Sequence, residues 1–402
     1  MTPSWPEVPA HAGPLGGVRV LDLSRVLAGP YAAMVLADLG ADVIKVERPV
    51  VGDDTRHWGP PFHGGDATYF LAVNRNRRAL AVDLATPDGL ALVARLAAAA
   101  DVVIENFLPR HFRKLGLDAV KSASDATWVS VRGAGSNGTD GENPGYDVMA
   151  QARSGLMHVT GTPEGPATKV GVAIADVVTG LHAAVAAVAG VAARARGGSA
   201  PTFEVPLLES MIAALVNQSS AALNGGVDPM RMGNEHPSVV PYGPLPAADV
   251  PLVVGAANDG QFAAFTRVLG LPDLAVDPRF ATNRDRVEHR AELLPLLVSR
   301  LVTRNAADWA VDLATAGVPS APVNTVADAL VDPHVAAAGL VVGTTHAGEP
   351  VRVVGSPFLV DGTRPVVRSG PPPIGADTDE ILAGLGLTAA EVEDLRGRGV
   401  VA

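Results

Sequence analysis

One carboxylate stands inside an apolar run between Val170 and Gly180, which reads VGVAIADVVTG. Asp176 is the only charged residue of this run. An ionised aspartate is rarely buried without a partner, because its removal from water is unfavourable. Asp176 is therefore either a helix cap or a reactive carboxylate, and the run by itself does not separate these interpretations.

Two short segments concentrate cations in a chain whose formal net charge is −11. They read VNRNRRAL (Val73–Leu80) and LPRHFRKLGL (Leu108–Leu117). Such clusters are usually solvated helix ends, and their alternative role is to dock a small polyanion. The acidic overall balance opposes binding of nucleic acid, which requires clustered cations that displace counterions. We therefore expect no nucleic acid partner.

Several common chemistries lack their residues in this chain. There is no cysteine, which excludes disulfides, thiolate metal ligands and thiol catalysis. The ten histidines show no H-x-x-x-H spacing, so a zinc site is not expected. The turn after the first expected strand, SRVLAGP, has one glycine where a dinucleotide fingerprint needs three. Neither a P-loop nor a G-x-S-x-G nucleophile elbow occurs.

The elements that must position these residues alternate between strand and helix patterns in the N-terminal half. A helix with Pro30 at its first position and Gly40 at its C-cap follows the first strand. Another has Thr86 as N-cap and Pro87 at its first position. Repeated strand–helix–strand units predict a parallel sheet covered by helices. The expected strands read VRVLDLS, DVIKVE, VVIENF and ATWVSVRG.

The length of 402 residues exceeds one ordinary core and indicates two or three domains. The segment LHAAVAAVAGVAARARGG is mostly alanine and is interpreted as a packed helix, not a membrane span. The N-terminal residues lack the basic and apolar regions of a secretory signal. We therefore expect a cytoplasmic protein with no membrane partner.

Taken together, the motifs resemble those of the class III (CaiB/BaiF) CoA-transferases, a family that also contains an α-methylacyl-CoA racemase branch. The resemblance covers essentially Gly16–Val401. Within the family it is greatest to the succinyl-CoA:glutarate type. The matching segments include VRVLDLSRVLAGPYAAMVLADLGADVIKVERPVVGDDTR, NRNRRALAVDL, DVVIENF, GYDVMAQARSGLMHVTG, GVAIADVVTG and PPPIGADTDEIL.

The resemblance implies an α/β fold with a Rossmann-like large domain built from both chain ends and an inserted smaller α+β domain. It also implies an interlocked homodimer. The expected limits are 14–200 for the N-terminal part of the large CoA-binding domain, 201–235 for a linker, 236–325 for the small domain, 326–355 for a second linker and 356–402 for the return to the large domain.

The resemblance further implies that Asp176 is the nucleophile. An enzyme carboxylate attacks the donor thioester to give a mixed anhydride, and CoA thiolate then forms an aspartyl thioester that the acceptor acid consumes. Both intermediates hydrolyse, so the apolar flanks of Asp176 would keep water away. Coenzyme A or acyl-CoA is a substrate in this interpretation, and no permanently bound cofactor is expected.

The expected CoA contacts also follow from the resemblance. Arg48 follows the KVE strand and is expected near the nucleotide phosphates. Lys114 stands where some members carry arginine. The lysine retains the positive charge of that arginine but not its bidentate geometry. Without the resemblance, these cations would be ordinary surface charges. The expected contact residues are Arg48, Val82, Asp83, Leu84, Ala85, Asn106, Phe107, Lys114 and Tyr146, with Asp147 beside Tyr146.

The alternative activity is racemisation of a 2-methylacyl-CoA. The racemase branch uses a histidine where this chain has Tyr146, and a tyrosine with its ordinary pKa is a poor base at neutral pH. Leu27 replaces a glutamine of formyl-CoA transferase, which argues against a formyl/oxalate pair. A dicarboxylate acceptor such as glutarate needs a second anchor, and the candidates are Arg56, Arg231 and His236.

One further segment has two interpretations. GAANDGQ (Gly255–Gln261) corresponds to a glycine loop that shields the thioester intermediate in formyl-CoA transferase, but it has fewer glycines. Its other interpretation is a strand-to-helix turn capped by Asn258.

Two further helices are expected outside the N-terminal half. One follows Val205 and reads PLLESMIAALVNQ. The other lies near the C-terminus, where Thr388 and Glu391 have the spacing of a capping box.

Overall fold

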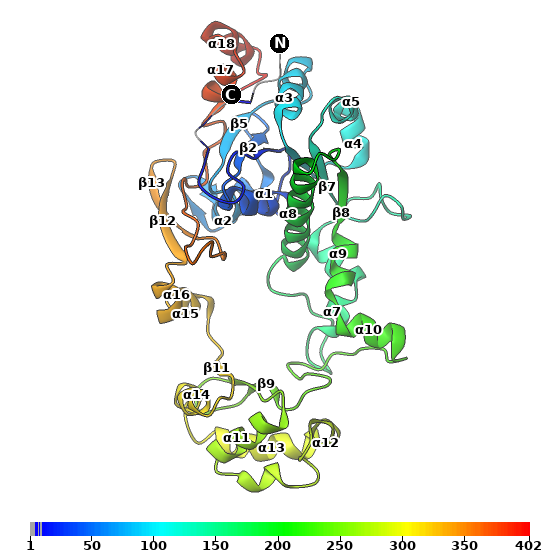
Figure 1. The fold of residues 1–402 in the computed structure, drawn as a ribbon, viewed down its shortest axis with the longest axis vertical. Coiled ribbons are helices and arrows are strands. Elements are labelled where there is room, and N and C mark those ends of the chain that lie inside the picture. Colours follow the sequence, from blue (N-terminus) through cyan, green and yellow to red (C-terminus); the bar gives the residue numbers. More distant parts are fainter. Residues whose placement is uncertain (1–4, 7, 9) are drawn as a thin grey trace. The chain divides into compact units, whose positions relative to one another are not determined.

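The computed structural model describes residues 5, 6, 8 and 10–402. The chain divides into two compact units (Figure 1). The larger unit comprises the chain up to Leu156 together with Lys169–Gly226 and His334–Ala402. The smaller unit comprises Met157–Thr168 and Val227–Pro333.

A six-stranded parallel sheet forms the centre of the larger unit, which confirms the predicted α/β class. From β1 the chain adds β2 and then β5 in one direction, and it returns to add β6, β7 and β8 on the other side. In open α/β sheets, ligands bind outside the carboxyl ends of the strands where the order reverses. The sheet order is β5 (Arg78–Ala81), β2 (Asp42–Glu47), β1 (Arg19–Asp22), β6 (Val102–Glu105), β7 (Thr127–Arg132) and β8 (Thr202–Pro206).

Each face of the sheet is covered by its own set of helices, because successive strand residues point to opposite faces. Leu21 and Val103 pack with one set, which consists of α3 (Pro87–Ala99), α4 (Pro109–Lys114), α5 (Leu117–Ser122), α17 (Thr378–Gly384) and α18 (Ala389–Gly397). Val20 and Val102 pack with the other, which consists of α1 (Ala28–Asp38), α6 (Asp147–Arg153), α8 (Ile174–Ala195) and α9 (Leu207–Ala214). With both faces buried, neighbouring strand positions are both apolar, as at Val20–Leu21 and Val102–Ile104.

The apolar helix α8 lies along α1 and against β7. In the described part of the chain it is the one helix whose length and hydropathy would allow a membrane span, a property shared by core helices of soluble proteins. Ala183, Ala184 and Ala187 bury its inner side in the same core as α1. This packing agrees with the prediction of a packed helix.

Several helix ends were predicted correctly, since their signals are local. Thr86 and Asn258 cap α3 and α11 (Asp259–Val268), and Thr388 forms a capping box with Glu391. The start of α1 differs, because the helix begins at Ala28 and Pro30 is its third residue. The helix expected after β8 is interrupted between α9 and α10 (Asn217–Asn224).

The C-terminal residues return to the sheet of the larger unit. Val401 bridges to Val82, and the Asp377 carboxylate accepts a 2.7 Å hydrogen bond from the N–H of Ala79. The remaining elements of this unit are η1 (Asp54–His57), β3 (Phe62–His63), β4 (Asp66–Ala67), α2 (Thr68–Val73), β12 (Val341–His346) and β13 (Glu349–Val354).

The smaller unit contains an antiparallel sheet in the order β11-β10-β9 and its own apolar core around Phe262, Phe265 and Trp309. Its elements are β9 (Tyr242–Leu245), β10 (Leu252–Gly255), α11, η2 (Pro272–Ala275), α12 (Asn283–Glu288), α13 (Arg290–Leu301), α14 (Ala306–Thr315), β11 (Ser320–Pro322) and α15 (Val326–Leu330). The short helices α7 (Leu156–Val159) and α16 (Pro333–Ala337) lie at two of the four places where the chain passes from one unit to the other.

The predicted domain limits stay a prediction. Several elements lie within the segments expected to be linkers. Among them, β8 is an edge strand of the large sheet, and the β12–β13 hairpin belongs to the larger unit.

Candidate active site

Asp176 is the third residue of α8, and its side chain is half-buried. Burial raises the pKa of Asp176 to about 7, and the nearby charge of Asp147 adds to this increase. The backbone N–H of Ala28, the first residue of α1, interacts with the carboxylate and lowers its pKa, which partly offsets this increase. At neutral pH, Asp176 therefore populates both its protonated and its ionised form.

Two side chains of α6 hold the segment that leads to Asp176. One Asp147 oxygen accepts a 2.7 Å hydrogen bond from the N–H of Ala175, in the first turn of α8. The other accepts a 2.7 Å bond from the amide of Gln151. The Gln151 oxygen in turn accepts from the N–H of Val170 at 2.9 Å. Asp147 thus satisfies a free donor at the start of α8, as an N-cap side chain does.

The surroundings of Asp176 are apolar on the side of α1 and α2. Leu27, Met34 and Val73 form a small buried cluster, against which Tyr69 and Ala173 pack. Burial and the charges of Asp176 and Asp147 raise the pKa of Tyr69 to about 12, so its phenol stays neutral at physiological pH.

The close crossing of α1 and α8 depends on Gly180. A Cβ atom at this position would lie 2.7 Å from the Ala28 carbonyl oxygen and 3.1 Å from Cδ1 of Tyr31. Both distances are shorter than ordinary van der Waals contact, so a side chain here would push the helices apart. Gly180 therefore lets the second turn of α8 pack closely against the first turn of α1.

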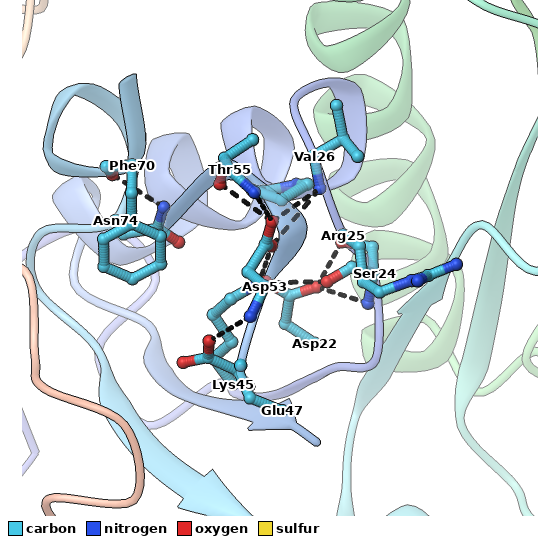
Figure 2. Close-up of polar contacts among 12 residues, drawn as sticks. Asp22, Ser24, Arg25, Val26, Lys45, Glu47, Asp53, Thr55, Phe70 and Asn74 are labelled. Atoms are coloured by element: carbon cyan, nitrogen blue, oxygen red, sulfur yellow. Dashed lines mark hydrogen bonds and ion pairs between the residues drawn. The ribbon is translucent and has the colours of Figure 1, made fainter. Parts of the chain in front are cut away.

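The turn between β1 and α1 is held by side chains from distant parts of the sequence (Figure 2). Lys45 donates to the Ser24 carbonyl at 2.9 Å, and the two Asp53 oxygens accept from the N–H of Val26 at 3.2 Å each. The Asn106 side chain accepts from the Arg25 N–H at 3.0 Å and donates to its carbonyl at 2.8 Å. The path of the chain from the sheet into α1 is therefore fixed by tertiary contacts.

A cavity of about 320 Å³ opens beside this turn. Its lining comes mainly from residues that directly follow β1, β2, β5 and β6, at the carboxyl edge of the sheet. This is where the reversal of strand order predicts a ligand. The lining residues are Leu23, Arg25, Val46, Glu47, Arg48, Gly52, Asp53, Val82, Asp83, Leu84, Ala85, Phe107, His111, Lys114 and Leu115.

Most residues expected to contact CoA meet in this cavity. Seven of them line it: Arg48, Val82, Asp83, Leu84, Ala85, Phe107 and Lys114. Asn106 lies next to it and bonds to the backbone of Arg25, one of the lining residues. Tyr146 does not line it; it is the N-cap residue of α6, its side chain is 60% exposed, and it precedes Asp147.

The cavity has cationic residues on its rim. Arg25 and Arg48 both pair with Asp54, at 2.9 and 2.6 Å, whereas Lys114 has no ion-pair partner among the described residues. Arg25 and His111 were not predicted as site residues. His111 belongs to the cation cluster of residues 108–117, and Arg25 directly follows a strand end, so both carried a usable signal.

The three candidate anchors for an acceptor carboxylate have different surroundings. Arg56 is 1% exposed, bonds to Glu47 at 2.7 and 2.8 Å, pairs with Asp66, and stacks on Phe70. Its donors are therefore engaged within the fold. Arg231 and His236 belong to the smaller unit, where Arg231 donates to the His158 carbonyl and His236 packs against the Tyr242 ring.

The segment Gly255–Gln261 is a capped turn between β10 and α11 in the smaller unit. The Asn258 side chain accepts from the N–H of Gln261 at 2.9 Å, and the Gln261 side chain accepts from the N–H of Ala257 at 3.0 Å. The predicted strand-to-helix turn is present, and its function as a lid stays a prediction. No group of three or more potential metal-ligating side chains occurs among the described residues.

The chain is similar to CoA-transferases over nearly its whole length. The profile of CoA-transferase family III matches residues 15–378. The succinyl-CoA:glutarate CoA-transferase of Mus musculus is 41% identical over 373 residues, which cover 92% of this chain and 86% of that protein. The succinate–glutarate CoA-transferase of Agrobacterium fabrum is 39% identical over 389 residues, or 94% of this chain and 97% of that protein.

A solved structure gives the same result for the fold. A CAIB/BAIF family protein from Brucella suis superimposes with a TM-score of 0.81 at 40% identity, covering 93% of this chain and 99% of that one. The parallel sheet and its helices are thus those of this family. The chain belongs to CoA-transferase family III and is a transferase.

Proposed function

We propose that the protein transfers CoA from a succinyl-CoA-like donor to a dicarboxylic acid such as glutarate, through a covalent intermediate on Asp176. The observation that carries this proposal is the placement of Asp176, a half-buried carboxylate with a pKa raised to about 7, at the crossing of α1 and α8. The names of the mouse and Agrobacterium relatives support the choice of acids.

The reaction divides into four acyl transfers in which no redox change occurs. The Asp176 carboxylate attacks the donor thioester carbonyl, and CoA thiolate leaves as a mixed anhydride forms. The thiolate then attacks the aspartyl carbonyl, which releases the donor acid and leaves an aspartyl-CoA thioester. The acceptor carboxylate attacks that thioester, and CoA thiolate leaves again. Finally the thiolate attacks the acceptor carbonyl of the second anhydride, which restores the carboxylate.

The surroundings of Asp176 suit these steps. A carboxylate whose pKa is raised by burial is a stronger nucleophile once ionised, and the apolar cluster around Leu27 limits access of water to the anhydride and thioester. The backbone N–H of Ala28, which interacts with the carboxylate, is a fixed donor for the oxyanion that develops at the aspartyl carbonyl.

The 320 Å³ cavity is proposed to hold the nucleotide end of CoA. Val82, Leu84, Ala85 and Phe107 offer apolar contacts for the adenine. The rim cations Arg48 and Lys114 offer charge to the phosphates. Arg25 and His111 are added to this set because they line the same cavity.

The proposal includes a cytoplasmic, interlocked homodimer with the domain limits predicted from the sequence. A continuous apolar strip on the outer side of α8 supports a partner subunit, since large exposed apolar patches usually mark interfaces. Its members Leu181, Val185 and Val188 are 42%, 67% and 39% exposed.

The deciding experiment incubates the purified protein with a panel of acyl-CoA donors and carboxylic acids and follows CoA exchange by mass spectrometry. Asp176→Ala is measured beside it, with Asp118→Ala, a change of an exposed carboxylate on α5, as the matched control. With donor alone, intact-protein mass spectrometry should show a gain of one CoA less one water, and this gain should be absent in Asp176→Ala.

Two outcomes contradict the proposal. Full exchange by Asp176→Ala would exclude the covalent mechanism. Racemisation of a 2-methylacyl-CoA without an acceptor acid, in the absence of CoA exchange, would support the racemase alternative instead.

A further inference from the structure

The turn from Ser24 to Leu27 contains Val26, whose strained backbone conformation is not favoured by its own side chain. Val26 has a φ of 69°, in the left-handed region that a β-branched residue rarely adopts. Such conformations persist only where surrounding contacts impose them, and they cluster at functional sites. The left-handed conformation of Val26 is therefore expected to depend on contacts from outside the turn.

Asp53 is the residue that holds Val26. Both of its oxygens lie 3.2 Å from the Val26 N–H, and the side chain is completely buried. Burial would raise the pKa of Asp53, but Lys45 and Thr55 outweigh it and lower this pKa below its usual value. Asp53 therefore presents an ionised acceptor, which bonds a backbone N–H more strongly than a neutral one does.

The acceptor is kept charged and correctly oriented by its own partners. Lys45, also completely buried, lies 3.0 Å from one Asp53 oxygen (Figure 2). Thr55 donates both its N–H, at 3.0 Å, and its hydroxyl, at 2.8 Å, to the other. The Asp53 N–H donates to Glu47 at 2.7 Å. Removing one partner of a buried ion pair leaves an uncompensated charge, so Lys45 stabilises the ionised form of Asp53 beneath the Val26 N–H.

The strained turn leads directly to the nucleophile. Val26 packs in the same apolar cluster as Leu27 and Ala173, and Ala173 is the N-cap residue of α8. Two residues after Val26, the N–H of Ala28 interacts with Asp176, and its carbonyl oxygen lies against Gly180. A rotation of Val26 out of the left-handed region would therefore move the first turn of α1 relative to Asp176.

We propose that Asp53 is a positioning residue, which holds Val26 in its left-handed conformation and thereby aims the Ala28 N–H at Asp176. The inference rests on the proposed function of Asp176. Asp53 also lines the cavity assigned to CoA, beside Arg25. The same turn therefore connects the nucleotide cavity with the reacting carboxylate.

The test is a rescue experiment. Asp53→Asn weakens the bond to Val26, and kcat should fall about 10-fold, the size expected from losing control over one left-handed residue. Val26→Gly should restore most of the lost kcat in the Asp53→Asn background, because glycine adopts a positive φ without a clamp. The KM for acyl-CoA should change less than kcat in both variants.

A second readout does not depend on activity. Asp53→Asn should accelerate amide hydrogen exchange in the peptide that contains Val26 and Ala28. In the activity assay, the same variant should move the acid limb of the kcat/KM profile to higher pH, since the Ala28 N–H no longer favours ionised Asp176. Asp38→Asn is the matched control, a buried carboxylate at the other end of α1 that pairs with Arg75, and it should leave the profile unchanged.

The result that overturns the inference is a loss of kcat in Asp53→Asn that Val26→Gly does not restore, or an equal loss in Asp38→Asn. If Asp53→Asn does not fold, Thr55→Val removes one donor to Asp53 without changing charge or shape. Its smaller loss of kcat must likewise be restored by Val26→Gly. Asp176→Ala separates the two proposals: full activity there rejects the covalent mechanism, whereas its inactivity together with a failed rescue rejects only the role of Asp53.

Discussion

The contacts of Asp176 suit the nucleophilic role that we propose for this carboxylate. Burial and Asp147 raise its pKa to about 7, while the Ala28 N–H limits the increase. A nucleophile of this kind is most effective when its pKa lies close to the working pH, because it is then both substantially ionised and strongly basic. The same opposing contacts govern how rate and stability depend on pH.

The first prediction concerns the pH profile. The kcat/KM of the wild-type protein should rise with pH and reach half its maximum near pH 7, as Asp176 loses its proton. Asp147→Asn removes the neighbouring charge, so the midpoint should move to lower pH. Initial rates measured over about 4 pH units centred on neutral pH test this. An unchanged midpoint in Asp147→Asn would contradict the electrostatic account.

The second prediction concerns stability. The folded-state pKa of Asp176 is above the unfolded value of 3.8, so the folded state binds more protons between these pH values and loses relative stability as pH rises. Asp176→Asn should therefore be more stable than the wild type by about 1–3 kcal/mol above pH 7, after a discount for partial exposure. Near pH 4 the difference should almost vanish. Urea unfolding at both pH values measures it.

At the scale of elements, the site is made by the meeting of helix starts at the carboxyl edge of a parallel sheet. α1 and α8 place the Ala28 N–H and Asp176 together, and α6 ties the segment before α8 through Asp147 and Gln151. The strand ends of β2, β5 and β6 provide the cavity lining. We therefore expect activity to depend separately on two features, the distance between α1 and α8 and the charge on the cavity rim.

The third prediction tests the helix crossing. Gly180→Ala places a Cβ 2.7 Å from the Ala28 carbonyl oxygen, so the helices must separate. We expect a loss of stability of about 1–3 kcal/mol and a lower kcat. Gly397→Ala on α18, where a Cβ would meet no atom within 4 Å, is the control and should be nearly neutral. Thermal unfolding and initial rates check both variants, and equal effects would exclude a role for the crossing.

The fourth prediction tests the cavity rim. Lys114→Ala should raise the KM for acyl-CoA about 10-fold with a smaller change in kcat, since an unpaired cation facing a phosphate contributes mainly to binding. Arg110→Ala, on the same helix but outside the cavity lining, should leave KM unchanged. Steady-state kinetics at two salt concentrations measure both. If the two variants behave alike, the effect is one of overall charge.

At the scale of the whole molecule, the chain leaves an apolar strip of α8 in contact with solvent. Leu181, Val185 and Val188 occupy successive turns on its outer side, while Ala183 and Ala187 face the core. α8 also carries Asp176, so a subunit that covers this strip would lie on the helix that bears the proposed nucleophile. Oligomeric state and activity are therefore expected to be linked.

The fifth prediction follows from this strip. Val185→Lys should convert a dimer into smaller or aggregated species, because it places a charge in the proposed interface. Val311→Lys is the matched control, since Val311 on α14 is 68% exposed and Val185 is 67% exposed. Light scattering coupled to size-exclusion chromatography reads the mass. A wild-type monomer, or a Val185→Lys dimer of unchanged stability, would contradict the interface.

Features that depend on local residues could be predicted from the sequence alone. Repeated strand–helix–strand patterns predicted the parallel sheet, and the caps at Thr86, Asn258 and Thr388 depended on contacts three residues away. Residues just after the strands, such as Arg48 and Val82–Ala85, line the cavity because carboxyl ends of parallel strands meet at one edge. The resemblance to a family singled out Asp176.

Two features depend on contacts between residues far apart in the sequence. These are the choice of charged side chains that form ion pairs within the fold, and the backbone conformations that tertiary contacts impose. Arg56, a candidate anchor in the sequence, is enclosed by Glu47, Asp66 and the Pro372 carbonyl, which is 316 residues away. Val26 adopts a conformation that its β-branched side chain disfavours, so its own sequence argues against it. The buried pair of Asp53 and Lys45 imposes it, because bonds made across the fold outweigh the local preference of a single residue.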